Sequence, residues 1–401
     1  MADDAVCRHL TLSSVRGYES AVLKVKKEIP AEFPHRGGCQ IVTYEIYHRV
    51  AKVLDALPNG FPSTPDGLEI KLLKKVFTPD EAELFCDLNP GLETVEQIAQ
   101  RTGRALDGLD AKLTSMAKRG ELLGIDFGST RLFAILPWVV GIYEYQIARM
   151  DRVFCELAEE YMRYFAPQFF ATQPHIMQTV PIQRTLPIQT EILATQQALP
   201  YQQVSAIIEN GKSFRVNECI CKKERGILGA PCKKPHEVCL AIGPVEGAEF
   251  ILDWGREISK QQAYEVLRKA EDAGLVHLTS NVESAHTFIC NCCGCCCGVL
   301  RPMNELNVAN VVNSHYYVEI DEDKCNGCGV CIDERCQVRA IEETDIKYRS
   351  IKERCIGCGL CVTACPTDAI KLVHKPQQEI MRPPIDMNAW NDARARHRSA
   401  G

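Results

Sequence analysis

Apolar side chains in the first half of the chain recur at helical spacing. Between residues 147 and 165 they return at steps of three and four, which predicts one helix with a buried face. The positions are Ile147, Met150, Phe154, Leu157, Tyr161, Tyr164 and Phe165. A second helix is predicted to begin after Ser259, where Gln262 completes a capping box, and to end at Gly274. Both buried faces are interpreted as core packing.

Two further capping boxes mark helix starts nearer the N-terminus. In the first, Thr78 precedes a proline and is followed three residues later by Glu81. In the second, Thr94 stands three residues before Gln97. A helix over 95–102, a second over 105–118 and a hairpin over 121–134 follow. Taken together, residues 66–136 resemble a winged helix-turn-helix domain.

The charges of this region disfavour DNA as its ligand. Residues 62–136 carry nine basic and twelve acidic side chains, a net charge of −3. A helix that enters the major groove needs lysine and arginine around it to contact phosphates. We therefore expect a protein-docking or structural module here.

The chain is predicted to be an α+β multidomain protein with six segments. Its domains are a mostly helical winged-helix-like module, a central cysteine-rich α+β segment and a C-terminal domain that contains the last eight cysteines. Prolines between 167 and 200 predict a surface connector. The segments are an N-terminal helical segment (1–61), the winged-helix-like module with its linker helix (62–166), the connector (167–210), the cysteine-rich domain (211–315), the domain of the last eight cysteines (316–374) and a tail (375–401).

Composition and charge place the chain among soluble globular proteins. Of 401 residues, 46% are hydrophobic and 24% are charged, and the net charge is −6. The first residues are acidic and lack the apolar core of a secretion signal. The longest apolar stretch, 132–142, is far shorter than the ~20 residues that span a bilayer. We expect a cytoplasmic protein with no membrane span.

The chain has 22 cysteines, and most of them lie in its second half. A reducing cytoplasm keeps thiols free, so this number points to metal or cluster ligation and away from disulfides. The four outside the clusters of cysteines are Cys7, Cys39, Cys86 and Cys155.

The last eight cysteines form two runs that repeat. The runs are Cys325, Cys328, Cys331 and Cys336, then Cys355, Cys358, Cys361 and Cys365. The first three members are offset by 30 residues, and the fourth by 29. Thiolates are soft ligands that suit iron-sulfur clusters, and three at this spacing hold three corners of a cubane.

These runs resemble the bacterial dicluster ferredoxin, in which the fourth cysteine of each run serves the other cluster. The resemblance implies that residues 316–374 form a ferredoxin-like dicluster domain with two 4Fe-4S clusters. One would be bound by Cys325, Cys328, Cys331 and Cys365, and one by Cys355, Cys358, Cys361 and Cys336. Paired zinc sites are the disfavoured alternative, because they use no third cysteine in a run. The first run departs from the pattern, with four residues before Cys336 and with Gln337 in place of a proline. We expect a reshaped loop near the second cluster.

The central cysteines are less regular and leave alternatives open. They are Cys219, Cys221, Cys232, Cys239, Cys290, Cys292, Cys293, Cys295, Cys296 and Cys297. Neighbouring side chains of an extended segment point to opposite faces, so one cubane does not use all of the last six. One or two further iron-sulfur clusters are the favoured interpretation, and zinc or reactive and buried thiols are the alternatives. Three histidines, at 236, 277 and 286, are interpreted as surface or hydrogen-bonded residues.

The order of these parts resembles a family of large ferredoxin-like proteins from anaerobic microorganisms. This resemblance implies electron transfer between partner redox proteins, a donor and an acceptor, and leaves open whether the protein is itself an enzyme. We find no convincing nucleotide-binding fingerprint or catalytic nucleophile motif. The alternatives are a redox-sensing winged-helix regulator, and an iron-sulfur oxidoreductase subunit that binds its substrate at the central cluster. The sequence gives no oligomeric state.

Overall fold

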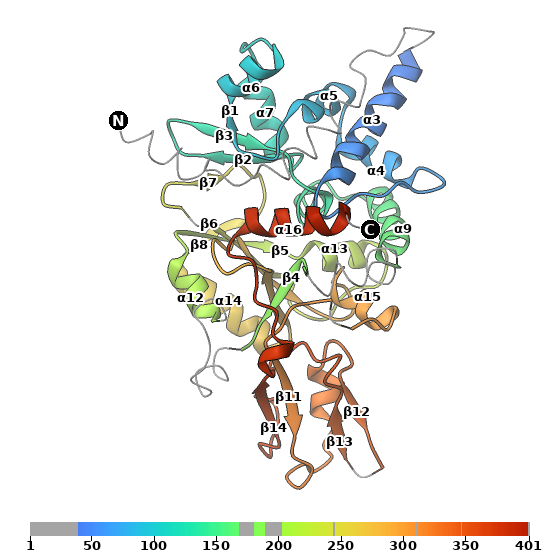
Figure 1. Cartoon of the computed structure of the whole chain (residues 1–401), viewed down its shortest axis with the longest axis vertical. Helices are drawn as coiled ribbons and strands as arrows, with labels where there is room; N and C mark the ends of the chain where they lie inside the picture. The colour runs from blue at the N-terminus through green and yellow to red at the C-terminus, as the bar shows by residue number, and fades with distance from the viewer. Residues whose placement is uncertain are drawn as a thin grey trace. The chain divides into compact units, whose positions relative to one another are not determined.

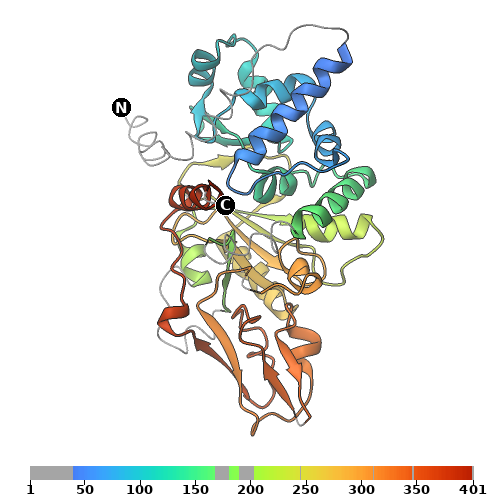
Figure 2. The same ribbon diagram turned by 45° about the vertical axis from the view of Figure 1, so that its right-hand side comes forward.

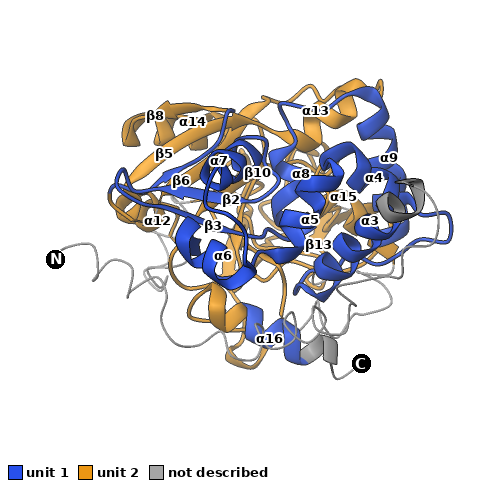
Figure 3. Cartoon of the chain, turned by 90° about the horizontal axis from the view of Figure 1, so that it is seen from above, with its two compact units in different colours: residues 1–165, 247–254, 391–401 blue, residues 166–246, 255–390 orange. Residues whose placement is uncertain are grey.

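The computed structural model describes residues 39–167, 180–188, 203–243, 245–309, 311–345 and 347–399. It is a mixed α/β structure with several antiparallel sheets. The chain forms two compact units, coloured separately in Figure 3. Unit 1 comprises residues 1–165, 247–254 and 391–401, and unit 2 comprises residues 166–246 and 255–390.

Helices make up most of the first part of unit 1. Both predicted capping boxes are present, at Thr78 and Thr94, and each begins a helix. The second predicted helix begins four residues later than expected, at Leu109. The helices are α3 (Cys39–Ala56), α4 (Leu68–Val76), α5 (Pro79–Asp87), α6 (Val95–Thr102) and α7 (Leu109–Lys118).

A small antiparallel sheet follows these helices. Its strands are β1 (Glu93–Thr94), β2 (Leu123–Asp126), β3 (Arg131–Ala134) and β7 (Glu249–Phe250), in the order β1-β3-β2-β7. Strands β2 and β3 form the predicted hairpin. Strand β7 comes from a much later segment, and pairs Ile125 with Phe250. Because β7 has only two residues, its sequence does not predict that it pairs with β2.

The helix predicted from the apolar pattern of residues 147–165 is shorter than expected. Turn η1 (Trp138–Ile142) and helix α8 (Tyr143–Tyr145) come first, and α9 (Arg152–Ala166) follows. Because α9 begins at Arg152, the prediction is wrong for Ile147 and Met150, which precede the helix. Asp151 accounts for the start, because its carboxylate accepts a hydrogen bond from the Phe154 N–H at 2.7 Å, as a capping side chain does.

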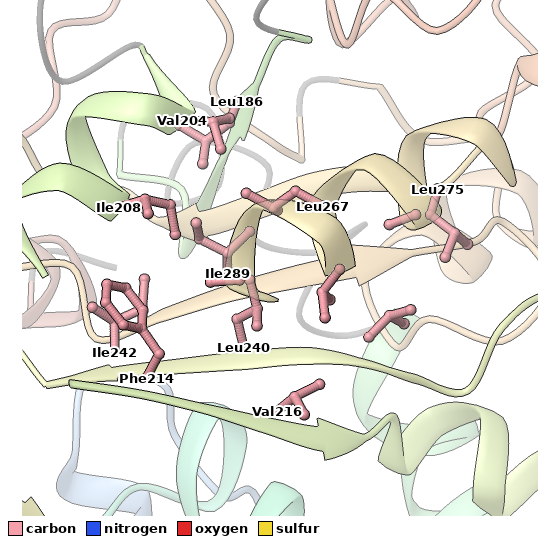
Figure 4. Close-up of a cluster of buried hydrophobic side chains, with 14 of the residues drawn as sticks. Leu186, Val204, Ile208, Phe214, Val216, Leu240, Ile242, Leu267, Leu275 and Ile289 are labelled. Carbon is pink, nitrogen blue, oxygen red and sulfur yellow. The ribbon is translucent and has the colours of Figure 1, made fainter. Parts of the chain in front are cut away.

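A longer antiparallel sheet forms the centre of unit 2, with the order β4-β9-β10-β6-β5-β8. Helix α14 (Lys260–Asp272) covers one face, with the predicted capping box at Ser259. Figure 4 shows Leu267 of α14 above Leu240 and Ile289 of the strands, in one apolar core. The strands are β4 (Gln183–Leu186), β5 (Ser213–Glu218), β6 (Glu237–Gly243), β8 (Arg256–Ile258), β9 (Val276–Ser280) and β10 (Phe288–Cys292).

The expected surface connector is wrong for residues 183–186. Strand β4 is buried along its whole length and pairs with β9, so it belongs to the sheet. Helix α12 (Val204–Asn210) also contributes Val204 and Ile208 to the core. Two other prolines of the proposed connector, Pro174 and Pro200, lie outside the described residues. Pro181 and Pro187 flank this strand of only four residues, and the prolines therefore concealed it in the sequence.

Two short strand pairs form the C-terminal part of unit 2, at the orange and red end of the ribbon in Figures 1 and 2. Strands β11 (Tyr316–Ile320) and β14 (Ile370–His374) pair antiparallel, as do β12 (Ile341–Glu343) and β13 (Tyr348–Ser350). A single helical turn, η4 (Cys331–Arg335), contains the extra residue of the first cysteine run.

Three helices and a short turn complete the described structure. Helices α13 (Ile220–Ile227) and α15 (Leu300–Glu305) adjoin the central cysteines, while turn η5 (Gln377–Glu379) and helix α16 (Met387–Ser399) follow β14. Trp390 of α16 is buried and donates to the Pro181 carbonyl at 2.9 Å. Among the residues that the structure describes, every helix is too short or too polar to cross a membrane.

Candidate iron-sulfur centres

The two C-terminal cysteine runs fold as near copies of one another. In each copy the fourth cysteine accepts a backbone hydrogen bond at its Sγ atom. The donors are the Ala340 N–H to Cys336 at 3.1 Å and the Ala369 N–H to Cys365 at 3.3 Å. The carbonyls of the same two alanines accept from Ile351 and Asp321. The sequence repeat is thus also a repeat of local structure.

Cys325, Cys328, Cys331 and Cys365 line one small cavity, together with Tyr348 and Thr367. We call these four cysteines the outer set. Three come from the first run and one from the second, which is the crossed grouping that the ferredoxin resemblance implies. Cys328 is exposed, whereas Cys331 is buried. Ligation by these residues stays a prediction.

Cys336 lies within electrostatic range of Cys355, Cys358 and Cys361. We call these four the inner set, and they complete the crossed grouping. Cys361 is buried, and the other three are half-buried. The chain therefore places Cys336 of the first run near the first three cysteines of the second run, and ligation by this set also stays a prediction.

The surroundings of the thiols shift their pKa values in both sets. Burial, followed by the charges of Cys355 and Cys336, raises the pKa of Cys358 to about 12. Burial also raises the pKa of Cys331 in the outer set, to about 11. Burial of Cys365 would raise its pKa, but hydrogen bonds from Thr367 and Ala369 outweigh it and lower the pKa. A bound cationic cluster would offset the cost of ionising the buried thiols.

Four central cysteines form a compact group, which we call the four-cysteine set. They are Cys232, Cys293, Cys295 and Cys296. Their Sγ atoms all lie within 4.8 Å of one another. The separation of the Cys293 and Cys295 Sγ atoms is 3.3 Å, and that of Cys232 and Cys295 is 3.8 Å. Cys293 and Cys296 are buried, whereas Cys295 is exposed. This donor set fits an iron-sulfur cluster or a tetrahedral zinc ion.

The other six central cysteines lie apart from these four, and we call them the six-cysteine set. They are Cys219, Cys221, Cys239, Cys290, Cys292 and Cys297. Contacts between their thiols link Cys219 to Cys221, Cys239 to Cys290, Cys290 to Cys292 and Cys292 to Cys297. The sequence predicted only that one cubane does not use all six cysteines of the stretch 290–297, and its spacing could not show where Cys232 and Cys239 belong.

Lys222 is a buried cation beside both central sets. Its side chain is fully buried, and its Nζ atom donates to the Pro235 carbonyl at 2.6 Å. Its charge acts on Cys219 of the six-cysteine set and on Cys293 of the four-cysteine set. A positive charge in this position lowers the pKa of both thiols and would offset the charge of an anionic cluster.

The three histidines form hydrogen bonds. His277 contacts Asn291 at 2.5 Å and His286 contacts Thr279 at 3.2 Å. His236 contacts the carbonyl of Cys232 through Nε2 at 3.1 Å. Burial lowers the pKa of His277, and burial with the Arg184 charge lowers that of His286 to about 3. These contacts agree with the interpretation of the histidines as hydrogen-bonded residues.

The departures from the ferredoxin pattern lie where the inner set adjoins the central region. Gln337 follows Cys336, and its Oε1 atom accepts a hydrogen bond from the Gly294 N–H at 3.0 Å. Asn304 donates to the Gln337 carbonyl, also at 3.0 Å. Arg335, at the end of η4, donates to the carbonyls of Glu271 and Asp272 at the C-terminal end of α14. The sequence flagged Gln337 as unusual but gave no sign of these contacts.

Gly294 itself stands between Cys293 and Cys295 of the four-cysteine set. A Cβ atom at this position would collide with the Gln337 carbonyl oxygen. Glycine therefore permits the loop of the inner set to lie directly against the loop of the four-cysteine set. Arg354, one residue before Cys355, adds hydrogen bonds to the Met303 carbonyl and the Asn307 side chain beside α15.

Comparison with known families gives one match, the 4Fe-4S binding domain, over residues 348–371. The match contains Cys355, Cys358, Cys361 and Cys365, the second of the two runs. Neither the curated proteins nor the solved structures include a match to the chain. The match and the grouped cysteines support an iron-sulfur domain of the ferredoxin type near the C-terminus, with a role in electron transfer.

Proposed function

We propose that the protein relays single electrons between a partner redox protein and its central cysteine region, through two 4Fe-4S clusters. The outer set would hold one cluster and the inner set the other. A bound 4Fe-4S cluster supplies a site that accepts and releases one electron at a time. The hydrogen bond between Gln337 and Gly294 carries this proposal, because it joins the inner set to the four-cysteine set.

Unequal exposure gives the relay an order. Cys328 of the outer set is exposed, and so are Asn326 and Gly327 beside it. A partner protein can therefore approach the outer set closely. Exposed acidic residues 321–323 precede this loop, so a partner with a basic surface would be favoured. The inner set, which adjoins the central region, would then pass electrons inward.

The relay is testable with the full-length protein purified without oxygen. We expect at least about eight irons per chain, with matching sulfide and with paramagnetic resonance signals from two reduced 4Fe-4S clusters. Near-zero iron together with several zinc ions would overturn the proposal.

The order of the relay needs a second measurement. On rapid mixing with a reductant protein, we expect Gln337→Leu to slow reduction of the central region and to leave reduction of the outer cluster unchanged. Gln337→Glu is the matched control, because its carboxylate still accepts the hydrogen bond from Gly294. Equal rates in the parent protein and both variants would contradict an inward path through this contact.

The exposure of Cys295 favours a second candidate function. A cluster in the four-cysteine set would present one corner to solvent, where a substrate could bind, as in an iron-sulfur oxidoreductase subunit. Its spectrum should then change when small substrates are added, and Cys295→Ser should abolish that change. A spectrum indifferent to every candidate substrate would leave electron relay as the function.

We infer that the winged-helix-like module docks proteins or serves a structural role. Its arginines are occupied by carboxylates within the same unit, which leaves them poorly placed for phosphates. The pairs are Arg101 with Glu93, Arg104 with Asp87, Arg119 with Glu81 and Glu121, and Arg131 with Asp110 and Asp126. Gel-shift measurements with oxidised and reduced protein should show no DNA preference. Redox-dependent binding would favour the regulator instead.

A further inference from the structure

The six-cysteine set is assembled by strand register. In the pairing of β10 with β6, Ile289 lies opposite Leu240. One position further along each strand, the same register places Cys290 beside Cys239. Ile289 and Leu240 point into the core beneath α14, so the two cysteines point away from that core. Cys292 lies two residues beyond Cys290 and therefore shares its face.

The other three thiols come from the ends of neighbouring elements. Cys219 caps the N-terminus of α13, and Cys221 lies in its first turn. Cys297 lies just before α15 and is within electrostatic range of Cys221 and Cys292. Cys219 also acts electrostatically on Cys290. The six thiols therefore form one connected group of neighbours from two strands and two helix ends, which Cys239 joins through Cys290.

The six-cysteine set is enclosed by protein. It is separate from the four-cysteine set. Cys219, Cys292 and Cys297 are buried, and the other three are half-buried. The backbone changes side between Cys292 and Cys293. Cys292 contacts Cys290 and Cys297, whereas Cys293 contacts Cys295 and Cys296. Neighbours in sequence thus belong to different sites.

So many thiols in one enclosed space imply a bound cation. Buried thiols that touch one another cannot all ionise, because each negative charge disfavours the next. The single ammonium of Lys222 could balance one thiolate of the six. Soft thiolates select iron-sulfur clusters, zinc or copper(I), but a tetrahedral zinc ion takes only four of them. A polynuclear centre uses a larger number.

We propose that Cys219, Cys221, Cys239, Cys290, Cys292 and Cys297 form one site that binds a polynuclear iron-sulfur cluster through more than the four thiolates of a cubane. The site is distinct from the four-cysteine set, and binding replaces thiol protons by iron without oxidising the thiols. The proposal rests on the proposed relay only for the identity of the metal. It would make this enclosed centre an inner electron store of the chain.

The first test measures iron, sulfide and zinc in variants of the full-length protein, purified without oxygen. Cys219→Ser/Cys290→Ser should lose the iron of this site, and the ferredoxin-type clusters and the four-cysteine set should keep theirs. Cys293→Ser/Cys296→Ser should give the reverse. The control is Cys86→Ser/Cys155→Ser, two buried cysteines of unit 1 that lie outside all four sets. Joint loss of iron in both central variants would overturn the separation of the sites.

The second test counts the ligands. Each of the six single Cys→Ser variants should change the same Mössbauer component, and variants of the four-cysteine set should leave it unchanged. If only four of the six change that component, the site holds an ordinary cubane and the proposal is wrong. Zinc in place of iron, or an iron-free site in a protein whose two ferredoxin-type clusters are intact, would also overturn it. Absence of those two clusters as well would instead refute the proposed function.

Discussion

The two cysteine loops of the ferredoxin-type region share one motif but differ in their surroundings. In the first loop, Asn326, Gly327 and Cys328 are exposed, whereas in the second Ile356 and Gly357 are buried. The second loop is also held by a hydrogen bond that the Ile188 N–H donates to the Cys358 carbonyl at 3.1 Å. The two loops therefore share a repeated motif, and packing against the rest of unit 2 makes their surroundings unequal. An electron relay with a direction requires that inequality.

The largest expected effect comes from breaking the crossed grouping. Cys336→Ala should remove about four irons and leave the same spectrum as Cys358→Ala, although the two residues belong to different runs. Cys365→Ala should likewise match Cys328→Ala. The measurement is iron content with paramagnetic resonance of the reduced protein. If Cys336→Ala instead matched Cys328→Ala, each run would bind its own cluster and the distinction between outer and inner sets would fail.

The next effect compares equivalent glycines of the two loops. Gly327 and Gly357 both have positive φ, so alanine costs about 1 kcal/mol at either position. A Cβ atom at Gly357 would also collide with the Tyr316 carbonyl and approach Ser314 Oγ to 2.6 Å, whereas nothing lies within 4 Å at Gly327.

We therefore expect Gly357→Ala to lower the free energy of unfolding by about 3 kcal/mol, and Gly327→Ala by about 1 kcal/mol. Anaerobic denaturant unfolding measures both. Equal losses of unfolding free energy would show that the two loops leave equal space for a Cβ atom.

The sequence predicted those features that depend on short-range patterns. Capping boxes at Thr78, Thr94 and Ser259 begin helices, because the interaction joins residues three apart. The duplicated cysteine runs also reveal themselves by spacing, since the ligands of one loop are close in sequence. The family match over the second run agrees with that interpretation.

Features that depend on strand register could not be predicted from the sequence. Cys232 and Cys239 are seven residues apart, yet they belong to different sets, because the sheet carries Cys239 to the face of Cys290. The contact of Gln337 with Gly294 joins positions 43 residues apart and needs the folded loop of η4. Strand β7, only two residues long, has too little pattern to predict its partner.

A smaller effect separates a half-buried arginine, Arg354, from an exposed one, Arg349, in the same region. Arg354 donates to the Asn307 side chain at 2.6 Å and to the Val338 carbonyl at 2.9 Å, which fixes the inner set against α15. Arg349 pairs with Glu342 at 2.6 Å on the surface.

We expect Arg354→Leu to cost about 2 kcal/mol of unfolding free energy, since it leaves partly buried carbonyls without donors. Arg349→Leu should cost at most about 1 kcal/mol, because exposed ion pairs contribute little. Thermal unfolding of the two variants under nitrogen makes the comparison. A larger loss in Arg349→Leu would mean that the inner set does not depend on this anchor.

The smallest effect should be confined to the outer set. Tyr348 lines its cavity, and the phenol oxygen lies 3.4 Å from where a Cβ atom of Gly329 would stand. Tyr348→Phe keeps the ring and removes only the hydroxyl, so stability should change by less than about 0.5 kcal/mol. A hydroxyl that donates toward cluster sulfur stabilises the reduced, more negative state, and its loss should lower the reduction potential of the outer cluster alone. Redox titration followed by paramagnetic resonance resolves the two clusters. A shift in the inner cluster as well would show that the two sets, despite their different surroundings, respond as one.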